Sequence, residues 1–173
     1  MHARWLALVA LVPLSGCLDY AGVTLQIDLK AGTAVMIVEG LGTTDRTEEL
    51  EDFADLVNEQ VLGDAIQKDH PEWTVGERSL YVTDGRLDGK VAFTFDDPQS
   101  LGLYKHDRKS PWFWCADSGD HITSTNGTII PNHPDCVVFE RKAKVLEVST
   151  RTGHQPESLM EAFLAWDGET FDE

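Results

Sequence analysis

The stretch VTLQIDLKAGTAVMIV, residues 23–38, decides the fold of this chain. Its first half alternates apolar and polar side chains, and the apolar positions are Val23, Leu25, Ile27 and Leu29. A period of two is typical of a β-strand with one buried face. Because Ala31-Gly32 breaks the pattern before a second apolar run, we predict an antiparallel hairpin.

An amphipathic helix is expected after this hairpin. Asp45, followed three residues later by Glu48, is typical of a capping box. Apolar residues then recur at helical spacing, at Leu50, Phe53, Ala54, Val57, Val61, Ala65 and Ile66. The helix is expected to end near Lys68, since a residue before proline, here His70 before Pro71, disfavours helical geometry.

The rest of the chain predicts further strands and a second helix. Strands are expected at 79–83, 90–95, 112–114 and 136–149, the last interrupted at 140–142. The pairs Asp84-Gly85 and Asp88-Gly89 mark the turn between the first two strands. A short helix is expected at 98–104, a polar loop at 118–132 and a terminal helix at 156–166.

These elements predict an α+β fold. One long amphipathic helix is expected to pack on one face of an antiparallel sheet, with a shorter C-terminal helix beside it. The length is that of a single domain with a continuous core.

The first residues have the three parts of an export signal. Arg4 is followed by the apolar stretch Trp5–Leu14, which is shorter than the roughly 20 residues that span a bilayer. The stretch ends in Leu14-Ser15-Gly16-Cys17, which resembles the lipobox of bacterial lipoproteins. The resemblance implies cleavage before Cys17 and attachment of diacylglycerol, with a palmitate-like acyl chain, to this cysteine.

The lipobox resemblance also implies a cellular location. Two or three acyl chains anchor a protein durably, so membrane attachment would need no help from the folded domain. Leu18, directly after the cysteine, favours the outer membrane within this family. We therefore expect a signal peptide at 1–16, a lipidated tether at 17–21 and one envelope domain at 22–173.

The order hairpin, helix, hairpin is similar to that of LppM-type bacterial lipoproteins, which also begin at a lipidated cysteine. The second hairpin ends in Asp88-Gly89-Lys90-Val91-Ala92-Phe93-Thr94-Phe95-Asp96. No residue-specific functional motif accompanies this likeness.

The charge and cysteine content narrow the classes of partner. The chain has 14 basic and 30 acidic residues, for a net charge of −16, which repels nucleic acid.

The chain has three cysteines. With Cys17 committed to lipid, Cys115 and Cys136 remain, and an exported compartment favours a disulfide over free or metal-binding thiols.

Histidines and carboxylates in the segment 106–133 are the best candidates for a metal site. They are His106, Asp117, Asp120, His121 and His133. Zinc takes such ligands, but no two histidines have the spacing of a compact zinc motif, and the order of a calcium loop is absent. Cys115 with His121 or His133 would suit thiol chemistry only if the cysteine were free.

Trp112, Phe113 and Trp114 form the densest aromatic cluster. In a strand, Trp112 and Trp114 would share one side, where they either pack in the core or form a binding surface.

These observations favour a lipid-anchored, non-enzymatic envelope domain that binds a partner or acts as a scaffold, with no cofactor. The candidate partners are an envelope protein, a glycolipid or a glycan. The alternative is a metal-dependent envelope hydrolase that uses the histidines and aspartates of 106–133.

Overall fold

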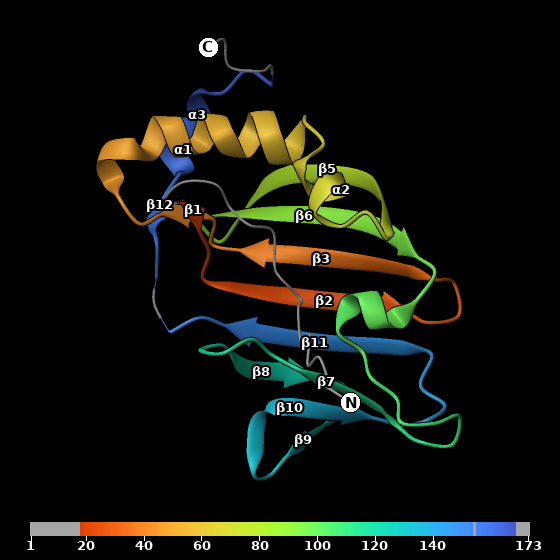
Figure 1. Ribbon diagram of the computed structural model, residues 1–173. Helices are drawn as coiled ribbons and strands as arrows, with labels where there is room; N and C mark the ends of the chain where they lie inside the picture. The colour runs from red at the N-terminus through yellow and green to blue at the C-terminus, as the bar shows by residue number, and fades with distance from the viewer. Residues whose placement is uncertain (1–17, 154, 169–173) are drawn as a thin grey trace, which may run out of the picture.

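The predicted hairpin is the centre of a six-stranded antiparallel sheet. The computed structural model describes residues 18–153 and 155–168 (Figure 1). Strand β2 (Gly22–Asp28) pairs with β3 (Thr33–Glu39), with Leu25 opposite Met36. The strand order across the sheet is β5-β6-β3-β2-β11-β8.

The outer strands flank this hairpin on both sides. They are β5 (Trp73–Thr83), β6 (Arg86–Phe95), β11 (Val145–Arg151) and β8 (His121–Thr125). Asp84 and Gly85 form the β5–β6 turn with φ angles of 51° and 75°, as a tight hairpin requires. The second pair expected at this turn, Asp88-Gly89, lies inside β6 instead, and Asp88 is buried. The strand is longer than predicted because its pairing with β3 and β5 continues through these residues.

One face of the sheet is covered and the other carries polar pairs. On the covered face, β2 contributes Val23, Leu25 and Ile27, which are all buried. On the opposite face, the hydroxyl groups of Thr24 and Ser149 are 2.8 Å apart in a hydrogen bond. The apolar residues of β2 therefore lie on the covered face and its polar residues on the opposite face, as the sequence predicted.

The predicted long helix is interrupted. A 3-10 turn η1 (Arg46–Glu48), helix α1 (Glu49–Asp55) and a π-helical turn η2 (Leu56–Val61) are continuous, and a bend precedes α2 (Ala65–Asp69). The N-terminal cap is Asp45, whose side chain accepts a hydrogen bond from the Thr47 amide at 2.9 Å. The buried stripe is Phe53, Leu56, Val57 and Gln60. Leu50, expected in that stripe, is 69% exposed.

Arg78 on β5 accounts for the interruption. Its Nη1 donates to the carbonyl oxygen of Gln60 at 3.2 Å and also to that of Gly63. A Cβ atom at Gly63 would collide with the carbonyl oxygen of Asn58, so the close turn requires glycine. The helix thus ends where an arginine from a distant strand binds its last carbonyl groups.

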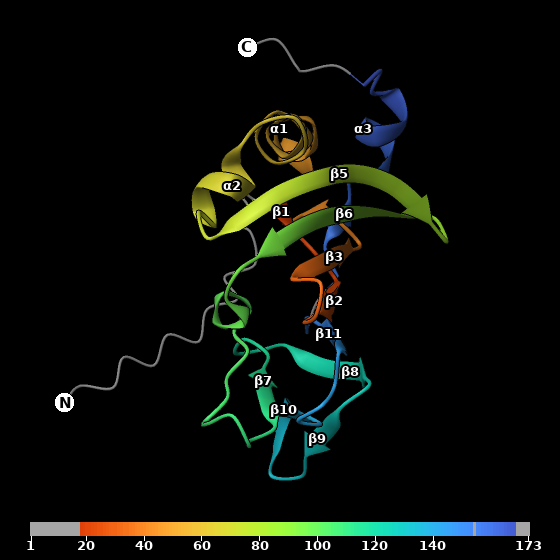
Figure 2. The ribbon, with the colours of Figure 1, turned by 90° about the vertical axis from the view of Figure 1, so that its right-hand side faces the viewer.

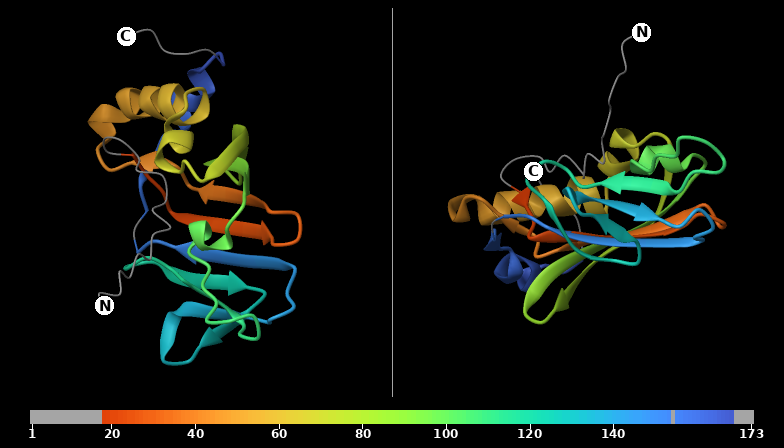
Figure 3. Two further views of the ribbon diagram at one scale, coloured as in Figure 1. Left: turned by 45° about the vertical axis from the view of Figure 1, so that its right-hand side comes forward. Right: turned by 90° about the horizontal axis from the view of Figure 1, so that it is seen from below.

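A second sheet covers the β2–β11 part of the main sheet. It has the order β7-β10-β9 and consists of β7 (Trp112–Cys115), β10 (His133–Phe139) and β9 (Thr128–Ile130). Figure 3 shows it at the end of the molecule opposite the helices. The short helix expected near Pro98 is the 3-10 turn η3 (Pro98–Leu101).

The segment 118–132, predicted as a loop, contains the strands β8 and β9. Their side chains are mostly polar, so no apolar alternation marks them. They are held by pairing with β11 and β10, and the Thr125 hydroxyl adds a 2.7 Å hydrogen bond to the Glu147 carbonyl oxygen.

Residues 18–21, expected as a tether, belong to the fold. Strand β1 (Leu18–Asp19) pairs with β4 (Gly42–Thr43), which also pairs with β12 (Glu157–Ser158). Leu18 is only 8% exposed. This correction follows from pairing with residues 42–43, a contact that the local sequence does not encode. Cys17 lies outside the described residues.

The terminal helix α3 (Met160–Ala165) is shorter than predicted but buries the expected face. Leu159 and Ala162 are buried, and the rings of Phe163 and Trp166 both contact Phe53 edge to face. None of the helices in the described part of the chain is long and apolar enough to cross a membrane.

The covered face contains two apolar clusters. The larger cluster joins the main sheet to the β7-β10-β9 sheet and includes Trp114 and Phe139. The smaller one joins α1, η2 and α3 to the end of the sheet and includes Leu18 and Phe53. Tyr20 packs against both clusters, so it lies where the two covers of the sheet meet.

The substitution Arg78→Met tests the helix interruption. It keeps much of the side-chain volume but leaves the carbonyl groups of Gln60 and Gly63 without their charged donor. We expect the free energy of unfolding to fall by about 2–3 kcal/mol, measured by urea denaturation.

Lys68→Met is the control, because the Lys68–Asp64 ion pair is exposed and should contribute little to stability. Equal effects of the two substitutions would contradict the role given to Arg78.

Candidate functional site

A cleft separates the η2 turn from strands β5, β6 and β3. Leu41, Leu56, Ile66 and Val91 form its buried lining. Half-buried residues surround the opening, namely Tyr20, Val38, Val61 and Leu80. The cavity volume is about 50 Å³, enough for a small apolar group.

Two local features of the sequence leave this space open. The bend after Val61 separates η2 from α2, so the helical layer does not cover the sheet continuously. On the sheet, Gly89 lacks a side chain, and a Cβ atom there would lie 3.1 Å from Cδ1 of Leu41 and 3.7 Å from Cδ2 of Leu80. Figure 2 shows β5 and β6 curving beneath α1.

Four polar residues belong to the cleft lining, namely Gln60, Arg78, Ser79 and Lys90, and Gln60 is the buried one among them. Gln60 is only 4% exposed, and its buried Oε1 has no hydrogen-bond partner within the described chain. Leaving a buried acceptor unsatisfied costs about 1–3 kcal/mol. The cleft therefore combines a largely apolar lining with one buried acceptor that has no hydrogen-bond partner within the described chain.

The sequence-predicted metal ligands do not come together. His106 and His133 are exposed, and Nδ1 of the exposed His121 lies 3.5 Å from Oδ1 of Asp135. Across residues 18–153 and 155–168, no three histidine, cysteine or carboxylate side chains form a group that could hold a metal ion. The structure thus adds no support to the hydrolase hypothesis.

Asp117 and Asp120 lie near Tyr20 instead. Both carboxylates line a small cavity of about 20 Å³ together with Trp114 and Thr150. Burial, and then the charges of Asp120 and Asp117, raise the pKa of Tyr20 to about 12. Burial also raises the pKa of Asp117. Burial, assisted by the two carboxylates, therefore favours the neutral phenol of Tyr20.

The aromatic cluster divides between core and surface. Trp114, proposed from sequence as part of a binding surface, is 6% exposed and packs in the larger apolar cluster. Trp114 packs in the core because the side of β7 that carries it faces the main sheet. Trp112 is half-buried, with Nζ of Lys105 4.3 Å from its ring centroid. Only Trp112 is left as a candidate for surface contacts.

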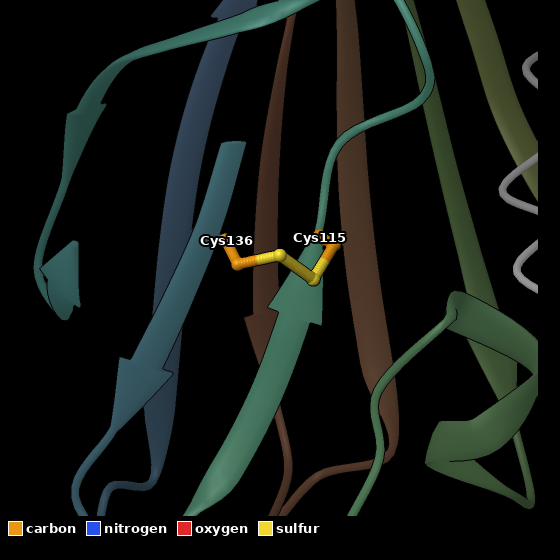
Figure 4. Close-up of a disulfide and its surroundings, with 2 residues drawn as sticks. All are labelled: Cys115 and Cys136. Carbon is orange, nitrogen blue, oxygen red and sulfur yellow. A yellow bond between two sulfur atoms is a disulfide. The ribbon is translucent and has the colours of Figure 1, made fainter. Parts of the chain in front are cut away.

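Cys115 and Cys136 stand opposite each other on β7 and β10 and are joined by a disulfide (Figure 4). The bond links two neighbouring strands of the smaller sheet. A bonded Cys115 is not a thiol nucleophile, so neither His121 nor His133 has a thiol to activate there.

Comparisons of the chain with protein-family models, with curated proteins and with solved structures find no match.

The sequence analysis did not predict the cleft. The signal that could have shown it is Gln60, a polar residue at helical spacing from Phe53, Leu56 and Val57 in an otherwise apolar stripe.

The substitution Gln60→Met tests whether the acceptor is unsatisfied. Replacing it with an apolar side chain of similar length should raise the free energy of unfolding by about 1 kcal/mol or more. Urea denaturation of the purified protein measures the change.

Gln67→Met is the matched control with the opposite expected sign. The Gln67 amide donates to the carbonyl oxygens of His70 and Trp73 and accepts from the Val75 amide. Its loss should therefore destabilise the fold by about 1–3 kcal/mol. A loss of stability in both variants would contradict our interpretation of Gln60.

The pKa of Tyr20 predicts an alkaline change in stability. Because its pKa is raised from 10.0 to about 12, the neutral phenol contributes its full stabilisation below pH 10. That contribution is lost as the pH rises from about 10 to 12, where the unfolded chain ionises first. Urea midpoints over this range should fall more for the wild type than for Tyr20→Phe. Parallel curves would rule out a shifted Tyr20.

Proposed function

We propose that this protein is a lipid-anchored component of a bacterial envelope whose domain binds an amphiphilic ligand without catalysing a reaction. Its lipobox sequence and Cys17 supply the anchor in this proposal. The cleft supplies the binding site, and the observation that supports it most is the buried, unsatisfied Oε1 of Gln60 between apolar walls. A ligand that inserts an apolar group and donates one hydrogen bond fits this arrangement.

The cleft chemistry favours a glycolipid among the partner classes considered from sequence. A free glycan has no apolar group to fill a lining made of Leu41, Leu56 and Val91. A protein partner would be expected to use a wider surface than a cavity of about 50 Å³. A glycolipid carries both an alkyl group and hydroxyl donors.

Octyl β-glucoside below its micelle concentration is a simple probe of this function. We expect saturable chemical-shift changes in the methyl groups of Val61, Leu80 and Val91, measured by NMR. Glucose at the same concentration should leave these signals unchanged, because it lacks the alkyl chain. A response to glucose alone would overturn the amphiphile proposal.

Two lysine substitutions on β5 separate the cleft from the rest of the strand. Leu80→Lys places a charge at the opening and should weaken binding at least tenfold, the factor that about 1.4 kcal/mol produces. Val82→Lys adds the same charge two residues away, at a position that is already 46% exposed, and should leave binding unchanged. Equal binding by both variants would place the ligand elsewhere.

A further inference from the structure

The strand that would carry the lipid anchor is built into the fold. Leu18 directly follows Cys17 in the sequence. Leu18 pairs with Thr43 and is 8% exposed. A lipid on Cys17 would therefore be joined to the domain without a flexible spacer.

From this connection we infer that the anchor holds the domain in one orientation on a phospholipid bilayer. The end formed by β1, β4, β12 and α3 faces the membrane, and the β7-β10-β9 sheet projects away from it. This inference rests on the proposed lipidation of Cys17.

Several contacts keep the start of the chain in place. Leu18 belongs to the smaller apolar cluster, together with Phe53 and Leu159. The Ala21 amide donates to the Glu39 carbonyl oxygen at 2.9 Å, and the Ala21 carbonyl accepts from the Thr152 amide at 3.0 Å. Pulling the anchor away from the domain would thus expose core side chains and break strand pairing.

The shape of the molecule gives this attachment a direction. Figure 1 shows α3 at one end of the molecule and the β9–β10 hairpin at the other, with β1 and β12 in the half that contains α3. For a domain of this size the radius of gyration is about 15 Å, so the far end lies roughly 30–40 Å from the anchored end. A tether of four free residues would reach roughly 13 Å and would allow the domain to turn.

The surface beside the anchor has mixed properties. Leu164 on α3 is 72% exposed, the highest value among the large hydrophobic side chains of the described chain. Glu157 and Glu161 on β12 and α3 are exposed as well, and their charges disfavour anionic headgroups. The orientation therefore depends on the anchor and on apolar contact, and a zwitterionic bilayer suits it best.

Fluorescence quenching in vesicles tests the orientation. The full chain, exported and processed with its own leader, carries one added cysteine, either Leu164→Cys or Ile129→Cys, labelled with a thiol-reactive fluorophore. Both positions are exposed, and the native Cys115 and Cys136 are bonded to each other. Vesicles of phosphatidylcholine contain a fraction of phosphatidylcholine with a nitroxide on its headgroup.

We expect severalfold stronger quenching at position 164 than at position 129. Equal quenching, or stronger quenching at 129, would overturn the orientation. A flexible Gly/Ser spacer of about ten residues between Cys17 and Leu18 should bring the two values together. An unchanged difference with the spacer would show that the short connection does not set the orientation.

The same samples separate this inference from the anchor itself. The intact mass reports the added lipid, and co-flotation with vesicles reports membrane attachment. Cys17→Ala should remove the added mass and abolish co-flotation. An unlipidated wild-type protein would overturn the anchor and with it the orientation. A lipidated, floating protein with equal quenching would overturn the orientation alone.

Discussion

The sheet buries only one of its faces, and that face is wider than a single cover. The helical layer packs over the β5–β6–β3 side, and the β7-β10-β9 sheet packs over the β2–β11 side. Tyr20 fills the junction between them. The cleft and the small cavity beside Asp117 both border this junction, since Tyr20 lines the first and its pKa is affected by the carboxylate of the second. Covering one broad face with two separate layers thus leaves a junction, and the bend after Val61 and the missing side chain at Gly89 open the cleft beside it.

The strands that carry their own apolar face were predictable from sequence, and those held by distant partners were not. The β2–β3 hairpin shows its alternation locally, because each buried residue is followed by one on the polar face. The backbones of β8 and β9 are paired with β11 and β10, and neither strand is long or regular enough to show an apolar alternation. The helix interruption depends on Arg78, which is remote in sequence from Gln60 and Gly63. Strand β1 likewise depends on Thr43 and Gly42.

The candidate site divides in the same way. The cysteine count correctly paired Cys115 with Cys136, because two cysteines were left once Cys17 was assigned to lipid. It also singled out Asp117 and Asp120, which do lie together, but beside Tyr20 and Trp114 rather than beside histidines. Apart from the polar Gln60 in the apolar stripe, the lining residues do not predict the cleft, since it results from a bend after Val61 and a missing side chain at Gly89.

The small volume of the cleft agrees with the lipid anchor that we propose. A cavity of about 50 Å³ buries only a few carbon atoms, and each methylene contributes about 0.8 kcal/mol, so affinity for a free ligand in solution should be weak. An anchored domain meets a ligand of the same bilayer at an effective concentration that can reach the millimolar range. Because Leu18 is fixed in β1, the domain does not have to lose the freedom of a long tether on binding. If Cys17 is lipidated and the cleft binds an amphiphile as we propose, a weak site would be occupied at the membrane and empty in solution, which would restrict binding to the membrane that holds the anchor.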